Sequence, residues 1–410
     1  MRPKKRRNDE ITSALAEVND EKILLQAAVE QQRLRQLRNE VINEDSTAAK
    51  ATKETKKKKY FRILMENDID DCSLSAKINK GTKRNKLQHV DDNNIVSVVT
   101  KLKAVKNEKG LKAALEACLS TAAKTQKEDL VLRIYKFILQ MHVEKQRVFS
   151  KEYRSLYSEF DLQVKFWGYV FETYFGNNTK ILLHWGDTMS NVCKKMNLRF
   201  KLDLRLLVWK EDAAIFDGGT GEVAKKATTA KLYSDRLKSV MATKCHLNEF
   251  LTSATYLKES VITEVRFPIV QIMGLDAHLC TMRLKDKKSY VLEEVCAFPF
   301  PVSLFGIRSG GIENLINGLS TIEGLLLELE RIYEEARNYE EDSMERIARG
   351  SQRPQKFLSK DWLTDAKMEK DEEDVEEDEE ENEEEDEEED EEEDEEEDEE
   401  EDEEDEEEDK

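Results

Sequence analysis

The sequence has few of the features that mark secreted, membrane-spanning or zinc-binding proteins. Its six cysteines include no pair at CxxC spacing, and scattered cysteines in a long chain are typical of free thiols in a reducing compartment. No apolar run approaches the roughly 20 residues needed to cross a bilayer. The basic N-terminus is followed by no apolar segment, so it does not have the form of a secretory signal. We therefore expect a soluble, intracellular protein with no membrane association and no zinc site.

Charge is distributed unevenly along the chain. Residues 371–410 contain 37 Asp or Glu and a single Lys, a net charge of −36, whereas the whole chain carries −24, which leaves +12 on residues 1–370. A segment of this composition cannot bury apolar surface, so we expect the tail to be disordered. A basic body joined to an acidic tail favours a body attracted to polyanions and a tail that competes for the same surface.

Composition and hydrophobic periodicity divide the chain into successive segments. We expect a basic N-terminus at 1–9, an amphipathic helix at 10–45, a flexible linker at 46–93, a helical region at 94–153, an α/β core at 154–349, a linker at 350–370 and a disordered polyacidic tail at 371–410. The helix at 10–45 either pairs as a short coiled coil, which would make the protein a homo-oligomer, or packs singly on the body. The basic cluster at 2–7 and the second basic run at 56–59 favour nuclear import, with an ordinary solvated basic segment as the alternative.

The core is expected to be α/β, with one mixed sheet flanked by helices, because helical and extended patterns alternate along it. The expected elements are a helix at 160–175, strands at 181–185, 200–209 and near 213–217, a helix at 228–257, extended segments at 262–273, 277–284 and 290–298, and a closing helix at 312–349.

Two acidic residues in this core, Asp203 and Glu222, are the main candidates for chemistry. They fall on neighbouring expected strands, and Lys225 follows the second. Two carboxylates that face one cleft can hold Mg²⁺ together with a substrate phosphate. Surface positions on an ordinary sheet remain the alternative for both. The glycine run at 218–221 lacks the spacing of a phosphate-binding loop, and we interpret it as a hairpin turn.

With these acids in this order, residues 155–300 resemble the PD-(D/E)xK nuclease superfamily, whose shared fold is a helix, a strand hairpin with its acids, a crossing helix and a final strand. The expected fold is therefore a restriction-endonuclease-like core. The resemblance implies that Asp203 and Glu222 bind Mg²⁺, and that Glu159 or Glu172 is the acid of the first helix.

The sequence departs from this family at one position. The resemblance implies a lysine two residues after the second acid, where it would orient the attacking water, but Ala224 stands there. Lys225 could substitute if a bulge turns its side chain back, or Lys231 could reach in from the crossing helix. Without either lysine the site would be inactive.

We accordingly expect a nuclear, nucleic-acid-associated protein with a nuclease-like core, with or without catalysis; if active, it would be a Mg²⁺-dependent phosphodiesterase. The basic residues after Glu222 would contact the phosphates of DNA or RNA, or would form a solvated helix face; they are Lys226, Arg236, Lys238 and Lys244. The alternative is a non-enzymatic protein that binds histones or other basic proteins through the helix at 10–45 and the acidic tail.

Overall fold

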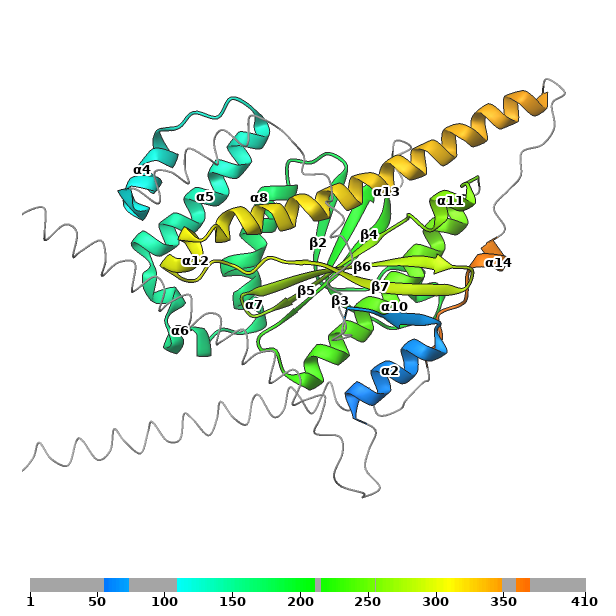
Figure 1. Ribbon diagram of the computed structural model, residues 1–410, viewed down its shortest axis with the longest axis horizontal. Coiled ribbons are helices and arrows are strands. Elements are labelled where there is room, and N and C mark those ends of the chain that lie inside the picture. Colours follow the sequence, from blue (N-terminus) through cyan, green and yellow to red (C-terminus); the bar gives the residue numbers. More distant parts are fainter. Residues whose placement is uncertain (1–54, 74–108, 211–214, 255, 349–358, 369–410) are drawn as a thin grey trace, which may run out of the picture. The chain divides into compact units, whose positions relative to one another are not determined.

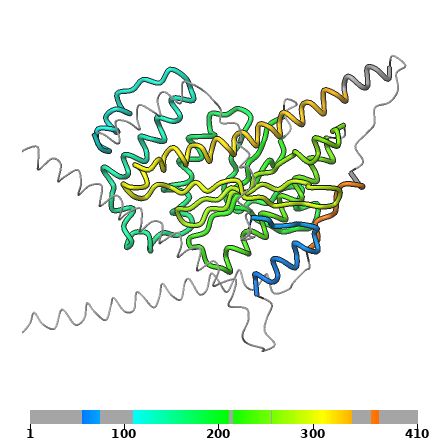
Figure 2. The backbone as a smooth tube through the Cα atoms, viewed as in Figure 1, coloured from blue at the N-terminus to red at the C-terminus, as the bar shows by residue number. Residues whose placement is uncertain are grey.

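In a computed structural model, the structure describes residues 55–73, 109–210, 215–254, 256–348 and 359–368 (Figure 1). The expected segments at 1–9, 10–45 and 371–410 lie outside the described residues, as does the first expected helix of the region at 94–153 (Figure 2). No helix in the described part of the chain is long and apolar enough to cross a membrane.

One mixed sheet of seven strands, in the order β1-β7-β6-β5-β4-β3-β2, organises the described residues. Its strands are β1 (Ile69–Asp71), β2 (Ile181–Thr188), β3 (Leu202–Trp209), β4 (Ile215–Ala224), β5 (Phe267–Met273), β6 (Asp276–Asp286) and β7 (Ser289–Ala297). Neighbouring strands are antiparallel except for the β4–β5 and β1–β7 pairs, which are parallel. The expected α/β class and mixed sheet are confirmed.

The helices that flank the sheet are α2 (Lys56–Glu66), α4 (Leu111–Ser120), α5 (Gln126–Glu144), α6 (Lys151–Ser155), α7 (Glu159–Leu162), α8 (Gly168–Phe175), α9 (Asn191–Lys195), α10 (Thr229–Ser253), α11 (Glu259–Ile262), α12 (Leu304–Arg308), α13 (Gly311–Ala348) and α14 (Ser359–Trp362). A π-helical segment, Gln163–Trp167, joins α7 to α8, so the helix expected at 160–175 is continuous but locally widened. Most of the expected element boundaries agree with these to within a few residues.

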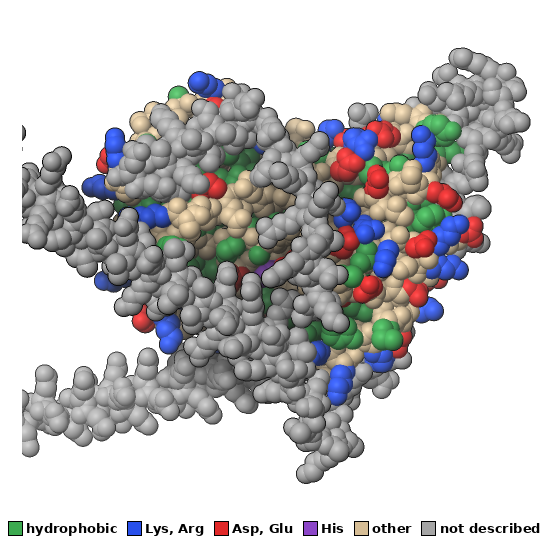
Figure 3. Space-filling view, in the orientation of Figure 1, with side chains coloured by type: hydrophobic (Ala, Val, Ile, Leu, Met, Phe, Trp, Pro, Cys, Tyr) green, Lys and Arg blue, Asp and Glu red, His purple; other side chains and the backbone are tan. Residues whose placement is uncertain are grey.

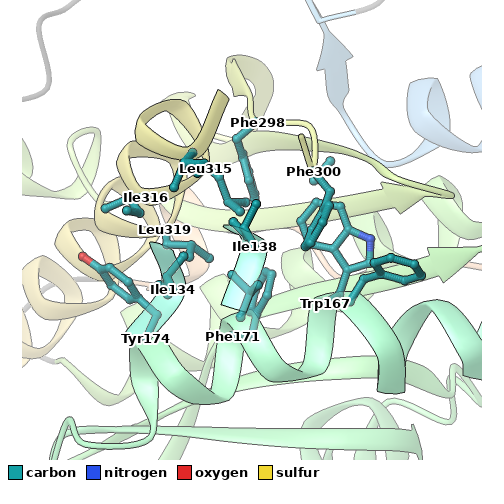
Figure 4. Close-up of a cluster of buried hydrophobic side chains, with 14 of the residues drawn as sticks. Ile134, Ile138, Trp167, Phe171, Tyr174, Phe298, Phe300, Leu315, Ile316 and Leu319 are labelled. Carbon is teal, nitrogen blue, oxygen red and sulfur yellow. The ribbon is translucent and has the colours of Figure 1, made fainter. Parts of the chain in front are cut away.

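One face of the sheet packs against α5, α8 and α13 through an apolar core. Strand β3 shows how the sequence builds this face. Leu204, Leu206 and Val208 recur at every second position, and all three are buried in that core, as a period of two requires. Aromatic side chains from the π-helical segment, from α8 and from the residues after β7 fill the space between the layers, among them Trp167, Phe171 and Phe298 (Figure 4).

The long helix α10 covers the opposite face. It begins where the Thr228 hydroxyl accepts a hydrogen bond from the Lys231 N–H, a standard N-cap. Most of its side chains are buried, including polar ones, because the sheet lies on one side of it and α2 packs on the other. The C-terminal segment also reaches α10, since the Lys244 ammonium contacts the carbonyl oxygens of Asn67 and Asp365.

The linker expected at 46–93 is wrong in its central part. Residues 56–71 form α2 and β1, and β1 extends the sheet at the β7 edge. Helix α2 is held by Tyr60, Ile63 and Leu64, which lie on one helix face and are buried. The linker expected at 350–370 is likewise wrong over 359–366, where α14 and the residues that follow it bury Trp362 and Ala366.

The glycine run at 218–221 does not form the expected hairpin turn, because it lies inside strand β4. Its glycines permit close packing. A Cβ on Gly218 would lie 2.6 Å from Val208 Cγ2 and 2.9 Å from Leu326 Cδ2, and one on Gly219 would lie 2.8 Å from the Pro268 carbonyl oxygen. The missing side chains therefore let β5 and helix α13 approach the centre of the sheet.

Candidate functional site

Adjacent strands place Asp203 and Glu222 next to each other. The β3–β4 ladder pairs Leu204 with Gly221, so Asp203 and Glu222 are the next residues along the two antiparallel strands. The Asp203 carboxylate accepts a hydrogen bond of 2.6 Å from the Val223 N–H, which fixes it against β4.

Both acids lie on the side of the sheet that α10 covers. Glu222 pairs in parallel register with Gln271 of β5, and the Gln271 amide donates to the Leu232 carbonyl oxygen of α10. Residues in register across a ladder point to the same face. Asp203 precedes the apolar series of β3 by one residue and therefore points away from the apolar core, toward α10.

Helix α10 brings a lysine and a third acid to these two carboxylates. The ammonium of Lys231 lies 3.5 Å from Oε1 of Glu159 and 3.9 Å from Oδ1 of Asp235. Glu159 stands at the first residue of α7, a helix begun by the capping box of Ser158 and Asp161. We call Glu159, Asp203, Glu222, Lys231 and Asp235 the carboxylate cluster.

Burial and mutual repulsion raise the pKa values of three acids in the carboxylate cluster. Burial, followed by the charges of Asp203 and Asp235, raises the pKa of Glu222 well above its usual value. Burial raises the pKa of Asp235 to about 7, against the opposing effect of Lys231. Burial, with Glu159 adding to it, also raises the pKa of Asp203, although its bond from the Val223 N–H acts in the opposite sense. Several carboxylates in one poorly solvated place therefore lose their charge more readily than solvated acids do.

Lys231, in contrast, keeps its charge in this cluster. Burial by itself would lower the pKa of Lys231, but Asp235, Glu159 and Asp203 together raise it above its ordinary value. Lys231 therefore remains a cation, and it is still about one third exposed, with 34 % of its side chain accessible. A permanent positive charge among partly neutralised acids is suited to contacting an anion such as phosphate.

Two oxygen atoms of the carboxylate cluster are buried without a hydrogen-bond partner among the described residues: Oε1 of Glu222 and Oδ2 of Asp235. Buried carboxylate oxygens are almost always satisfied, so these two atoms are available to a water, an ion or a ligand. In the described part of the chain, no three His, Cys, Asp or Glu side chains are grouped so that they could hold a metal ion. Mg²⁺ requires only one or two protein carboxylates, with water and substrate phosphate completing its coordination.

The other expected site residues are placed elsewhere. Lys225 lies on the opposite side of β4, where it lines a cavity together with Leu275 and Phe300 of the apolar face, and no bulge is recorded beyond Gly221 to turn it back. Ala224, at the position of the family lysine, is buried. Glu172 is on α8 and accepts a hydrogen bond from Trp185, so Glu159 is the acid of the first helix that reaches the site.

The expected phosphate-binding residues divide into two groups. Lys226 is exposed, and Lys238 is half-buried and lies close enough to Glu222 to lower its pKa. Arg236 and Lys244 are buried, which corrects their assignment to a solvent-facing basic stretch. Arg236 pairs with Asp71 at 3.1 Å, and Lys244 donates to the end of α2. Because α2 and β1 cover this side of α10, neither residue can reach a polyanion.

The described surface seen in Figure 3 shows no large patch of one sign over β6, β7 and α11, where Lys and Arg are intermixed with Asp and Glu.

A second polar cluster lies deeper under α10. His246 Nε2 lies 2.9 Å from Ser190 Oγ and 4.0 Å from both Cys193 Sγ and Asp217 Oδ2. The neighbouring Cys245 thiol and the His246 ring lower the pKa of Cys193. Because Cys193, Cys245 and His246 are all buried, no substrate can reach this thiol, and we assign the cluster to packing of α9 on α10.

Sequence reasoning missed Asp235 as a member of the carboxylate cluster. Lys231, Asp235 and Lys238 recur at steps of four and three residues on α10, so they lie on one helix face. A charged stripe on a helix that is otherwise largely buried was the signal in the sequence that could have identified Asp235.

Comparisons with family models, with curated proteins and with solved structures found no match to this chain.

Proposed function

We propose that this chain is a Mg²⁺-dependent phosphodiesterase that cleaves nucleic acid, with a core built on the plan of the PD-(D/E)xK nucleases. The observation that carries the proposal is the placement of Asp203 and Glu222 side by side on adjacent strands, with Lys231 at the same cluster. A cation and two acids in one partly buried place suit phosphoryl chemistry better than a structural role, since they cost stability unless they are used.

The order of the elements supports the same plan. Helix α7–α8 is followed by three antiparallel strands, β2 to β4, then by the crossing helix α10 and by β5, which returns parallel to β4. This order resembles the helix, acid-bearing hairpin, crossing helix and final strand of the PD-(D/E)xK plan, and it supports the proposal in that respect. Strands β6, β7 and β1 extend the sheet beyond it.

The residues present suit a divalent cation. Asp203 and Glu222 would hold it, and Oε1 of Glu222 has no hydrogen-bond partner among the described residues. When bound, Mg²⁺ would polarise the scissile phosphate and lower the pKa of a water ligand. Its charge would also favour the ionised carboxylates, which burial now disfavours.

Lys231 takes the part of the lysine that the family places after the second acid. Glu159 and Asp235 hold its ammonium at 3.5 and 3.9 Å, and these acids keep it protonated. A fixed ammonium of this kind can contact a phosphate oxygen and orient the attacking water, and it acts by charge rather than by accepting a proton. Lys225, on the other face of β4, has no part in this step.

The test is a nicking assay with the full chain on supercoiled plasmid in Mg²⁺ or Mn²⁺. We expect Asp203→Ala and Glu222→Gln to lower the cleavage rate by at least about 100-fold, as removal of a metal-binding or charge-stabilising group does. Lys231→Ala should lower it comparably, while Lys285→Ala, a matched control at an exposed position on β6, should leave the rate unchanged. Cleavage by the parent that survives Asp203→Ala would rule out this site.

Nuclear location is part of the same proposal and rests on the basic cluster at 2–7. The acidic tail would compete with nucleic acid for the basic body. If so, a chain ending at Asp371 should bind DNA more tightly than the full chain at low salt, with the difference shrinking as salt is added. Equal affinities at low salt would show that the acidic tail does not compete with DNA for the basic body.

A further inference from the structure

A cavity of about 780 Å³ lies on the face of β4 opposite α10. The β5–β6 turn, the loop after β7 and the start of α13 form its walls, and Lys225 lies where the cavity meets the end of β4. Its size falls within the range of small-molecule sites, about 300–1,000 Å³. The carboxylate cluster accounts for none of this space.

The carboxylate of Glu159, a member of the carboxylate cluster, links the cluster to the cavity. Oε1 of Glu159 accepts the Lys225 N–H at 3.2 Å and contacts the Lys231 ammonium at 3.5 Å. Lys225 belongs to the cavity wall, and Lys231 belongs to the cluster. A chain of nucleotides with one phosphate at the cluster would therefore have its neighbouring nucleotide at the mouth of the cavity.

The lining has the chemistry that recognises a nucleotide. Arg154 and Lys225 supply positive charge for a phosphate, and Asn314 and Asn317 supply amide donors and acceptors for base edges. Asp276 can accept hydrogen bonds from exocyclic amino groups, and burial raises the pKa of this carboxyl. Phe300 also lines the cavity and is buried, so this part of the floor is apolar.

Exposed apolar side chains beside Glu159 give a second, independent indication. Phe160 is 71 % exposed and Leu156 75 % exposed, although both flank a well-packed helix. Tyr153, one turn earlier, is 45 % exposed. Exposed aromatic side chains next to cationic ones are the usual surface for stacking unpaired bases.

We propose that this cavity receives one unpaired nucleotide next to the phosphate held at the carboxylate cluster, which makes single-stranded or frayed nucleic acid the substrate class. This assignment rests on the proposed function, since the cluster supplies the scissile phosphate. A base inside a duplex is stacked and paired, and it reaches a pocket only if it is extruded at a cost. A single strand enters without that cost.

The test measures binding rather than cleavage. A fluorescently labelled oligodeoxycytidylate is titrated with the full chain in EDTA, and its anisotropy is compared with that of the same strand annealed to its complement. Asn317→Trp places a large side chain in the cavity from an exposed position on α13, and Asn338→Trp, at an exposed position on the same helix outside the cavity, is the matched control. We expect Asn317→Trp to weaken single-strand binding about tenfold, and Asn338→Trp to leave it unchanged.

Phe160→Ala should also weaken single-strand binding about tenfold, through loss of base stacking. Circular dichroism melts establish that each variant is folded. Single-strand affinity that is unchanged by Asn317→Trp overturns the cavity assignment, and an equal loss of single-strand and duplex affinity overturns the substrate class. Either result leaves the nicking assay to decide the proposed function by itself. A parent chain that binds neither form also overturns the cavity assignment, and the nicking assay in Mg²⁺ still decides the proposed function.

Discussion

The two faces of the sheet are built on different principles. The face under α5, α8 and α13 is apolar and rich in aromatic side chains, and it holds Trp167 and Phe171 with no exposed area. The face under α10 is equally buried but polar, with Asp235, Arg236 and Lys244 among its side chains. Burial of apolar surface stabilises the first face directly, whereas charges on the second must be paired or used.

The α10 face itself has two parts. Near α2 and β1 its charges are paired, as in the contact between Arg236 and Asp71. Near α7 the acids outnumber the cations that contact them, and Glu222 and Asp235 each retain an unpartnered oxygen among the described residues. The first part holds the N-terminal segment on the core, and the second is where a ligand would gain most from binding. Four sets of substitutions would test these differences between the faces and their parts.

The largest loss is expected on the apolar face. Trp167→Ala should lower the free energy of unfolding by about 4 kcal/mol, because it removes a fully buried ring and leaves a cavity. Urea denaturation measures the change. Trp209→Ala removes the same side chain from a position that is 37 % exposed, and it should cost much less. Similar losses for the two variants would mean that the apolar face is not the main source of stability.

The paired part of the α10 face should depend on both partners of an ion pair. Arg236→Ala is expected to cost about 3 kcal/mol, because Asp71 is then left buried without its cation. The double variant with Asp71→Ala should recover part of that loss, which a double-mutant cycle would measure by urea denaturation. Losses that simply add would show that the two charges do not stabilise each other.

In the part of the α10 face near α7, the charge of Asp235 should destabilise the fold as the pH rises. Burial raises the pKa of Asp235 to about 7, above the value of about 3.9 for an unfolded Asp. Its ionisation therefore penalises the folded state progressively from about pH 4 to pH 7. Asp235→Asn should raise the free energy of unfolding by roughly 2 kcal/mol at pH 8 in EDTA, with the gain vanishing near pH 4. Urea curves at several pH values measure it, and a gain independent of pH would contradict the assignment.

The smallest effects are expected within the glycine run of β4, and they should rank by what each new methyl group meets. At Gly219 the obstacle is the Pro268 backbone oxygen at 2.8 Å, which cannot move without shifting β5. At Gly221 the nearest atom is Leu204 Cβ at 3.1 Å, and a shift of a few tenths of an ångström would relieve that contact. Gly219→Ala should therefore cost about 2 kcal/mol and Gly221→Ala about 1 kcal/mol or less. Thermal melts would give the order, and the reverse order would place the close approach elsewhere.

Local patterns were sufficient for much of the sheet and its helices. Alternation in β3 places Leu204 and Leu206 on one face and Asp203 on the other, because successive side chains of a strand point to opposite sides. The same rule puts Lys225 on the face away from Glu222. Long helices such as α13 follow from apolar residues at three- and four-residue steps.

Local patterns failed where distant segments of the chain decide burial. Lys244 and Arg236 have the composition of a solvated helix face, yet residues 56–73 and 359–366 cover them. The glycine run has the composition of a turn. Its real role, which is to let β5 and α13 pack closely against β4, depends on contacts that the local sequence does not show.

The sequence by itself therefore determined the α/β class, the candidate acids Asp203 and Glu222, and Lys231 as one of the two lysines that could replace the missing one. Those properties depend on periodicity and on residue type, which are local. Only the tertiary structure placed Lys231 rather than Lys225 beside the acids, added Asp235 to them, and set the cavity next to Glu159. These depend on contacts between α7, β4 and α10, and long-range contacts of this kind leave no periodic signal in the chain.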